Sequence, residues 1–319
     1  MTGGAVRRVS SGVTQPLRLP LESEVDQSRL LHFTFDGKRL TGHPGDTLAS
    51  ALLANGTGLV GRSFKYHRPR GIFSAGSEEP NALVQLRDGD RQEPNTRATM
   101  VELFDGLTAT SQNRWPSLAL DIQGLNGLIA PFIPSGFYYK TFMWPRSWWT
   151  GVYEKIIRRA AGMGIATREA DPDRYEKMHA HCDLLVVGAG PAGLAAALTA
   201  AESGARVIIC DEGNALGGAL RREQDYLDNE PALNWVRLVA SRLAASPDVR
   251  ILTRTSAFGY YDHNTLGLIE QVADHQPVPP EWMPRQRLWT VRARKVVLAT
   301  GATERPLVFP GNDRPGVML

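Results

Sequence analysis

Hydrophobic and polar positions begin to alternate after residues 1–29, a polar and aperiodic stretch that we interpret as a tail. The segment Leu31–Phe35 alternates with a period of two, which predicts a strand with one buried face. The pair Asp36–Gly37 suits a tight turn. Lys38–Thr41 is therefore the expected return strand of a hairpin.

A short helix is expected next, over Thr47–Ala54, because leucines recur on one side of it. Asp46 suits the helix N-cap and Asn55–Gly56 suits its end. Two further strands fit at Ala82–Leu86 and Thr99–Leu103. A strand, a hairpin, a second strand and a helix are the opening of a β-grasp, ferredoxin-like domain, which we expect over residues 30–109.

The loop Gly61–Gly76 interrupts this pattern with basic and aromatic residues. Its charged members include Lys65, His67, Arg68 and Arg70. We hypothesise that they face a nucleotide or a partner chain, and the alternative is a long solvated loop.

Residues 110–180 predict an aromatic-rich connector without a clean period. Four of the seven tryptophans lie there, at Trp115, Trp144, Trp148 and Trp149. Exposed aromatic clusters are typical of interfaces, although these side chains could equally pack on this chain's own domains.

The pattern changes again at His181–Val187, an apolar run with β-branched residues that predicts a buried parallel strand. The glycine-rich segment Gly188–Gly193 follows directly. Leu194–Ser203 then predicts a helix, and Arg206–Cys210 predicts a second buried strand that ends at Asp211 and Glu212. Strand, glycine loop, helix, strand and terminal acid together predict a Rossmann-type dinucleotide site.

Each residue type in this motif has a physical reason. Gly188 permits the tight turn, Gly190 the close approach of a pyrophosphate, and Gly193 close packing of helix on strand. The helix N-terminus offers N–H groups and partial positive charge to phosphates. Asp211, 18 residues after Gly193, suits a ribose diol and would repel a 2′-phosphate, so NAD or FAD is favoured over NADP.

A double glycine, Gly217–Gly218, follows the acid, and the strand Lys295–Leu298 later ends in Ala-Thr-Gly at Thr300 and Gly301. This arrangement resembles the glutathione-reductase-like oxidoreductases. The expected dinucleotide-binding domain is residues 181–319, incomplete at the C-terminus. The candidate cofactor-binding residues are Gly188, Gly190, Pro191, Ala192, Gly193, Asp211, Glu212, Gly217, Gly218, Thr300 and Gly301. The fold class is α/β, a Rossmann-like domain preceded by the small β-grasp domain.

Composition narrows the function further. The net charge of +3 is small, which argues against a nucleic-acid partner. The two cysteines, Cys182 and Cys210, form no CxxC pair, so we expect neither a metal site nor an iron–sulfur cluster. The longest uncharged stretch, Ile122–Tyr139, is broken by prolines and glycines, so we expect no membrane span and a cytoplasmic location.

Longer strings of this sequence resemble the alpha subunits of heterotetrameric sarcosine oxidase. They are Gly45–Gly56, Ser63–Gly71 with Glu78–Leu83, and Gly136–Pro145 followed by the glycine motif. The resemblance implies an N-terminal ferredoxin-like domain without a cluster, and NAD in the glutathione-reductase-like part, with FAD as the alternative. It also implies beta, gamma and delta partner subunits, with amine oxidation at FAD in beta and an FMN between alpha and beta.

The catalytic residues are unknown from the sequence: no Ser–His–Asp pattern stands out, and His181 is a lone histidine. The resemblance implies an oxidoreductase subunit in oxidative demethylation of sarcosine to glycine. Two alternatives remain. One is a subunit of a related opine, proline or glycine dehydrogenase that binds FAD, and the other is a non-catalytic scaffold that holds a dinucleotide.

Overall fold

The computed structural model describes residues 15–19, 24–128, 136, 142, 144–221, 225–227 and 229–319. Contacts divide the chain into two compact units. One comprises Met1–Glu169 with Pro306–Leu319, and the other comprises Ala170–Arg305. The second unit thus begins before residue 181 and ends at Arg305, whereas the dinucleotide-binding domain was expected over residues 181–319. Residues 306–319 group with the N-terminal unit instead.

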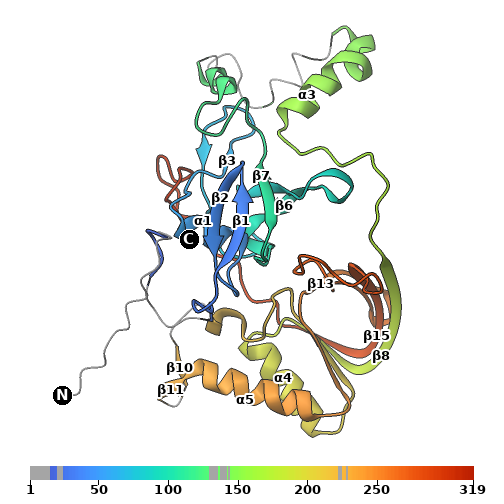
Figure 1. The fold of residues 1–319 in the computed structure, drawn as a ribbon. Coiled ribbons are helices and arrows are strands. Elements are labelled where there is room, and N and C mark those ends of the chain that lie inside the picture. The colour runs from blue at the N-terminus through green and yellow to red at the C-terminus, as the bar shows by residue number, and fades with distance from the viewer. Residues whose placement is uncertain are drawn as a thin grey trace, which may run out of the picture. The chain divides into compact units, whose positions relative to one another are not determined.

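The first unit contains a five-stranded mixed sheet with the strand order β2-β1-β7-β5-β6 (Figure 1). β1 pairs antiparallel with β2 and parallel with β7. The strands are β1 (Leu31–Phe35), β2 (Lys38–Gly42), β3 (Gly61–Arg62), β4 (Pro69–Arg70), β5 (Leu83–Leu86), β6 (Glu93–Arg97) and β7 (Leu107–Ser111). The α-helices are α1 (Leu48–Ala54) and α3 (Glu154–Ala160). Short 3₁₀ turns lie at Gly89–Arg91, Ala98–Met100, Ile122–Gly127 and Arg146–Trp148, and a π turn lies at Trp149–Tyr153. This sheet confirms the predicted ferredoxin-like fold.

The core of this unit follows the alternation of buried and more exposed residues along β1. Leu31, Phe33 and Phe35 are buried against one face of the sheet, where Leu48 and Leu52 of α1 meet them. Each such side chain contributes about 1.5–3 kcal/mol of transfer free energy. The hairpin and the first helix are thus fixed by one hydrophobic cluster.

Two local predictions were wrong. The N-cap of α1 is Thr47, which forms a reciprocal capping box with Ser50, whereas Asp46 is buried and binds Arg18. Arg18 donates from both terminal nitrogens to the two Asp46 oxygens, at 2.9 and 2.6 Å, and a buried carboxylate needs such compensation. The expected strand Thr99–Leu103 begins instead in a 3₁₀ turn, and the sheet is completed by β6 and β7.

The second unit contains a six-stranded sheet with the order β12-β9-β8-β15-β14-β13. β12, β9, β8 and β15 are parallel, and β14 and β13 continue the sheet antiparallel. The strands are β8 (Tyr175–Val187), β9 (Val207–Cys210), β10 (Tyr226–Leu227), β11 (Glu230–Pro231), β12 (Val249–Leu252), β13 (Thr255–Tyr261), β14 (Thr265–Gln271) and β15 (Gln286–Leu298). The helices are α4 (Pro191–Glu202) and α5 (Ala232–Ala245), with 3₁₀ turns at Gly218–Arg221 and Asp262–Asn264.

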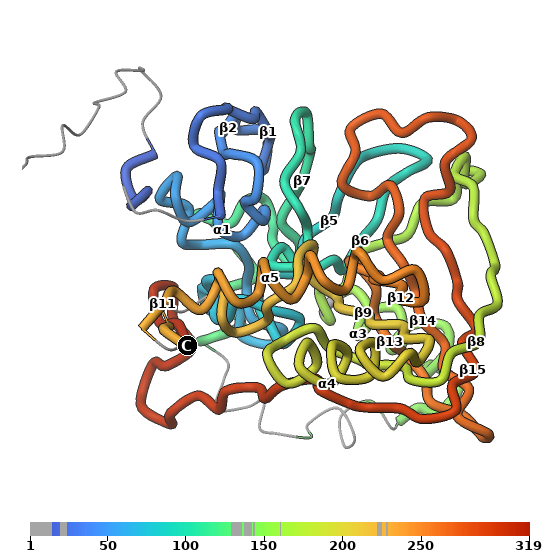
Figure 2. The backbone as a smooth tube through the Cα atoms, turned by 90° about the horizontal axis from the view of Figure 1, so that it is seen from below, coloured from blue at the N-terminus to red at the C-terminus, as the bar shows by residue number. Residues whose placement is uncertain are grey.

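Adjacent residues of the central strands pack on opposite faces of this sheet. Val186 and Ile209 meet α4 and α5, which lie side by side on one face (Figure 2). Leu185 and Ile208 pack on the other face, in a cluster with Leu268 of β14. Because both faces are covered, β9 is apolar throughout, and the predicted Rossmann-like arrangement is confirmed.

None of the helices in the described ranges is both long and apolar enough to cross a lipid bilayer.

Candidate dinucleotide site

The glycine loop lies at the carboxyl end of β8, between that strand and α4. Gly188 follows the strand with φ +98°, a left-handed conformation that a side chain would strain. Gly190 is the N-cap of α4, and Pro191 occupies the first turn, where its missing N–H is no loss. Among the described residues no side chain caps this helix, so its N-terminal donors face the loop end of the sheet.

Two of the glycines are required by close packing. A Cβ at Gly193 would lie 1.9 Å from the carbonyl oxygen of Gly188. A Cβ at Gly188 would lie 2.3 Å from the carbonyl oxygen of Ala299 and 3.3 Å from the amide nitrogen of Thr300. The glycine loop, the start of α4 and the Ala-Thr-Gly turn therefore touch through their backbones.

The double glycine closes a second side of the loop. A Cβ at Gly218 would lie 2.8 Å from the Cα of Gly190, and Gly218 has φ +54°. Gly217 has φ +125° and donates its N–H to the carbonyl of Ala189 at 2.8 Å. By contrast, a Cβ at Gly190 would meet nothing nearer than 3.9 Å, so space remains above it.

Asp211, the acid at the end of β9, is held in place by backbone hydrogen bonds, one of them from the glycine loop. Asp211 accepts from the N–H of Ala189 at 2.7 Å and from that of Gly213 at 2.8 Å, one on each carboxylate oxygen. Each oxygen keeps a further lone pair. A carboxylate fixed in this way is oriented in advance for a hydroxyl donor.

Most of the predicted site residues are brought together. Gly188, Gly190, Gly193, Asp211, Gly217, Gly218 and Thr300 surround the end of β8. Pro191 and Ala192 are exposed in the first turn of α4, and Glu212, Thr300 and Gly301 are exposed as well. Sequence reasoning missed Ala189, which is buried and binds both Asp211 and Gly217 through its backbone. No side-chain signal could have revealed it.

The two cysteines are buried and free of disulfides. Burial raises the pKa of the Cys182 thiol to about 11. Burial, with a smaller contribution from the Asp211 carboxylate, raises the pKa of Cys210 to about 12. Thiols with such pKa values are poor nucleophiles at neutral pH, which fits a packing role.

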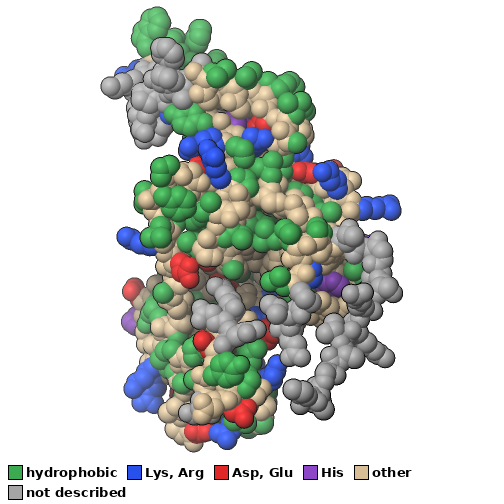
Figure 3. Space-filling model, turned by 90° about the vertical axis from the view of Figure 1, so that its left-hand side faces the viewer, with side chains coloured by type: hydrophobic (Ala, Val, Ile, Leu, Met, Phe, Trp, Pro, Cys, Tyr) green, Lys and Arg blue, Asp and Glu red, His purple; other side chains and the backbone are tan. Residues whose placement is uncertain are grey.

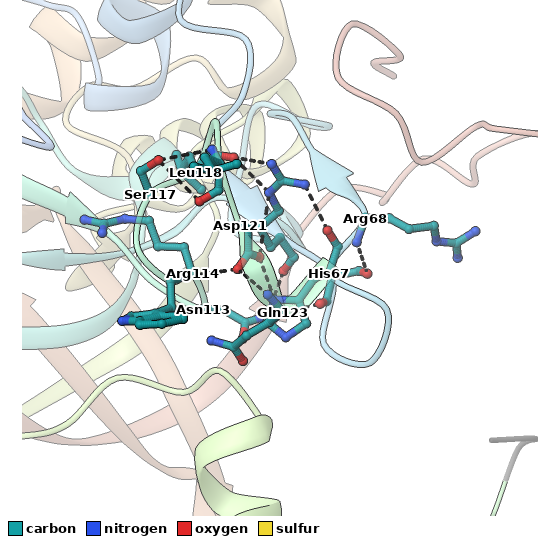
Figure 4. Close-up of polar contacts among 12 residues, drawn as sticks. His67, Arg68, Asn113, Arg114, Ser117, Leu118, Asp121 and Gln123 are labelled. Atoms are coloured by element: carbon teal, nitrogen blue, oxygen red, sulfur yellow. Dashed lines mark hydrogen bonds and ion pairs between the residues drawn. The ribbon is translucent and has the colours of Figure 1, made fainter. Parts of the chain in front are cut away.

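The basic loop of the first unit is engaged within this chain (Figure 4). His67 is 2% exposed, and its Nδ1 lies 2.7 Å from an Asp121 carboxylate oxygen. The Arg62 guanidinium donates to the carbonyls of His67 and Leu118. A fully solvated loop is therefore wrong for His67.

The arginines of the same loop bind the C-terminal segment. Arg70 forms an ion pair with Asp313 and also donates to its carbonyl at 3.0 Å. Arg68 lies 3.3 Å from the same carboxylate, but its side chain is 61% exposed and points away from the histidine network (Figure 4). The ion pairs with Asp313 therefore account for the two arginines, Arg68 and Arg70, without a contact to a nucleotide.

The four tryptophans of the connector are exposed. Trp144 is 84% exposed, and Trp148 and Trp149 are 53% and 42% exposed. Much of the segment Phe137–Trp144 that suggested an interface lies outside the described residues. Hydrophobic side chains also lie scattered over one face of the molecule, with lysines and arginines between them (Figure 3).

Candidate catalytic groups do not emerge. His181 is exposed on β8. Within the described ranges no group of three or more His, Cys, Asp or Glu side chains could hold a metal ion.

Comparison with known protein families gives two matches. Residues 28–114 match the 2Fe-2S iron-sulfur cluster binding domain, and residues 182–318 match the pyridine nucleotide-disulphide oxidoreductase family. Both cysteines lie outside the first match, so residues 28–114 lack the thiolates that hold such a cluster.

Curated relatives match nearly the whole chain. Sarcosine oxidase subunit alpha of Rhizobium meliloti (strain 1021) is 60% identical over 302 residues, which cover 95% of this chain and 31% of that protein. The subunit alpha of Corynebacterium sp. (strain P-1) is 39% identical, over 95% of this chain and 27% of its own length. This chain thus spans 27–31% of the length of these relatives.

A solved structure gives the same fold. L-proline dehydrogenase from P. horikoshii superimposes with a TM-score of 0.57 at 20% identity, and the match covers 91% of this chain and 44% of that one. The similarity to the sarcosine oxidase alpha subunits that the sequence indicated is confirmed over 95% of this chain.

Proposed function

We propose that this chain is the nucleotide-holding N-terminal part of the alpha subunit of a sarcosine oxidase, and that it binds NAD. The observation that carries the proposal is the open space over Gly190 at the uncapped N-terminus of α4, beside the fixed carboxylate of Asp211. The pyrophosphate of a dinucleotide is the ligand that such a helix terminus favours.

The residues divide the binding work. The N–H groups of the first turn of α4, near Gly190 and Gly193, would hold the pyrophosphate. The free lone pairs of Asp211 would accept from a ribose diol, and its negative charge would disfavour a 2′-phosphate. Thr300 and Gly301, next to Gly188, would border the rest of the ligand. Bound NAD would supply a nicotinamide ring capable of hydride exchange.

Oxidation of the amine is proposed to take place outside these residues. The similarity to proteins named sarcosine oxidase subunit alpha supports an oxidoreductase that acts on sarcosine. We propose that the whole enzyme converts sarcosine to glycine, with FAD and FMN in or shared with beta, gamma and delta partners. This chain's part is then to hold its nucleotide and to support assembly.

The identity of the nucleotide tests the proposal. The purified chain would be examined by absorbance, and the nucleotide released by heat would be identified by mass spectrometry. We expect NAD from a colourless protein. FAD from a yellow protein would instead favour the opine, proline or glycine dehydrogenase reading.

A second experiment separates nucleotide holding from catalysis. The isolated chain should not oxidise sarcosine, and activity should appear only when flavin-bearing partner subunits are added. Sarcosine oxidation by the isolated chain would contradict the division of labour, whatever nucleotide it holds.

A further inference from the structure

A buried glutamate organises the loop that precedes β5. Glu79 is 1% exposed. One carboxylate oxygen accepts from the N–H groups of Phe73 and Ser74, both at 2.7 Å. The other accepts from Asn81 at 2.7 Å and from Ala82 at 3.0 Å. The loop 73–82 thus directs four backbone donors at one buried anion.

Such a cage of N–H groups is a binding site for negative charge. Burying a carboxylate is costly unless several hydrogen bonds replace its hydration. Successive backbone N–H groups in a turn form an anion-binding concavity of the kind that also surrounds iron–sulfur clusters. The carboxylate of Glu79 therefore occupies a place that suits an anionic group.

Glu79 and two of the residues that bind it, Ser74 and Ala82, have the spacing of the ligands in an iron–sulfur cluster loop. Plant-type [2Fe–2S] sites use the spacing C-x₄-C-x₂-C with a fourth, distant cysteine. With Glu79 at the second ligand position, the first falls on Ser74 and the third on Ala82. Both residues are buried, and their N–H groups are among the four that bind Glu79.

A fourth residue reaches the same loop from a distant segment. Thr99 is 5% exposed and donates its hydroxyl to the carbonyl of Gly76 at 2.7 Å. Its neighbour Ala98 donates to the carbonyl of Ala82 at 2.9 Å. Thr99 thus brings a side chain to this loop from a distant segment, as the fourth ligand of such a site does.

We infer that loop 73–82 and Thr99 form a converted cluster site. The four ligand positions are held by Ser74, Glu79, Ala82 and Thr99, and the Glu79 carboxylate replaces the cluster as the acceptor of the loop's N–H groups. Hydroxyl, carboxylate and methyl groups do not hold a [2Fe–2S] cluster, which agrees with the lack of cysteines in residues 28–114. The loop keeps its fold without iron because the Glu79 carboxylate accepts the hydrogen bonds of its N–H groups.

Removal of the charge on Glu79 tests the first half of this inference. Glu79→Gln keeps the shape but turns an amide NH₂ toward two of the four N–H donors. We expect the midpoint of thermal unfolding of the first unit to fall by roughly 5–10 °C. Glu78→Gln, the same change at the exposed neighbour, should leave it unchanged. Equal midpoints for the two variants would overturn the inference.

Restoration of the ligands tests the second half. The full chain carrying S74C, E79C, A82C and T99C would be incubated anaerobically with ferric iron and sulfide. We expect about two iron atoms and two sulfides per chain, with visible absorption bands. The matched control moves every cysteine by one residue, as A75C, P80C, L83C and M100C.

The two outcomes of this reconstitution are distinct from those of the proposed function. Equal iron in both four-cysteine variants, or none in the first while circular dichroism shows it folded, would overturn the converted site. If the first variant fails to fold, the comparison of Glu79→Gln with Glu78→Gln decides. The nucleotide bound by the second unit is measured separately, so its identity does not affect either result.

Discussion

Two loops of this chain gather backbone N–H groups, and they satisfy them in opposite ways. In loop 73–82 the acceptor belongs to the chain, because Glu79 takes four donors on a buried carboxylate. In Gly188–Gly193 the N-cap of α4 is a glycine, and no described side chain caps that helix. The first loop is closed on itself and the second is open to a ligand.

The difference shows how one physical demand can serve folding or binding. Buried N–H groups need acceptors in either case. A loop that carries its own anion is rigid before any ligand arrives. A loop that ends at an open helix N-terminus stays a site for phosphate, and it can be fixed only by backbone packing, as at Gly188 and Gly193.

The largest expected effect would break the open loop at that packing. Gly193→Ala puts a methyl group 1.9 Å from the Gly188 carbonyl oxygen, and backbone cannot move cheaply. We expect the free energy of unfolding of the second unit to fall by at least about 3 kcal/mol, measured by chemical denaturation. Gly190→Ala is the matched control, because its nearest neighbour is 3.9 Å away. Equal stability of the two variants would contradict the packing argument.

A smaller effect sharpens the comparison at Asp211, the acid at the end of β9 that binds the open loop. Asp211→Asn replaces one acceptor by a donor, so the N–H of either Ala189 or Gly213 loses its partner. We expect a loss of about 2 kcal/mol in the free energy of unfolding, by chemical denaturation. Asp262→Asn, at an exposed turn, should change it by less than about 0.5 kcal/mol. If Asp211→Asn is equally harmless, its carboxylate does not hold the loop.

The smallest effect concerns the strand that supports the open loop. The pKa of Cys210 is about 12 in the folded chain, against about 8.5 for a free thiol, so the unfolded chain loses this proton first as pH rises. The stabilising contribution is complete below about pH 8.5 and is lost as pH rises toward 12. Between pH 8 and 9.5 the wild type should lose about 1 kcal/mol more stability than Cys210→Ala.

This pH experiment has a clear negative. Chemical denaturation of both proteins at the two pH values gives the difference directly. Identical losses in the wild type and in Cys210→Ala would mean that Cys210 ionises equally in the folded and unfolded chain, and that it is not buried as the structure has it.

The sequence predicted those parts of the fold whose pattern is local. The hairpin at Asp36, the helix after Thr47 and the strand–glycine–helix–strand unit from His181 to Cys210 each have strong periodicity, and the structure has them. The predicted strand at Thr99–Leu103 was wrong, because Ala98–Met100 forms a 3₁₀ turn, in which the Thr99 hydroxyl binds the carbonyl of Gly76. β8 begins earlier than expected, at Tyr175, because pairing with β15 extends a half that is polar and exposed.

The candidate site could be predicted at positions that require glycine, but not at positions that contribute only backbone hydrogen bonds. Gly188, Gly193 and Gly218 have positions that a Cβ cannot occupy, and glycine marks such positions in a sequence. Ala189 contributes only its N–H and carbonyl, which every residue type carries. Glu79 could not be recognised either, because a buried carboxylate and an exposed one, such as that of Glu78, are the same letter in a sequence.

The most direct measurement is a calorimetric titration of NAD into the nucleotide-free chain and into Gly190→Val. The space above Gly190 is where a pyrophosphate would approach, so the larger side chain should fill it and leave the fold intact. We expect one saturable site in the wild type and at least a 10-fold weaker affinity in the variant. A folded wild-type chain that binds neither NAD nor FAD, or a variant that binds as tightly as the wild type, would contradict a dinucleotide site at this loop.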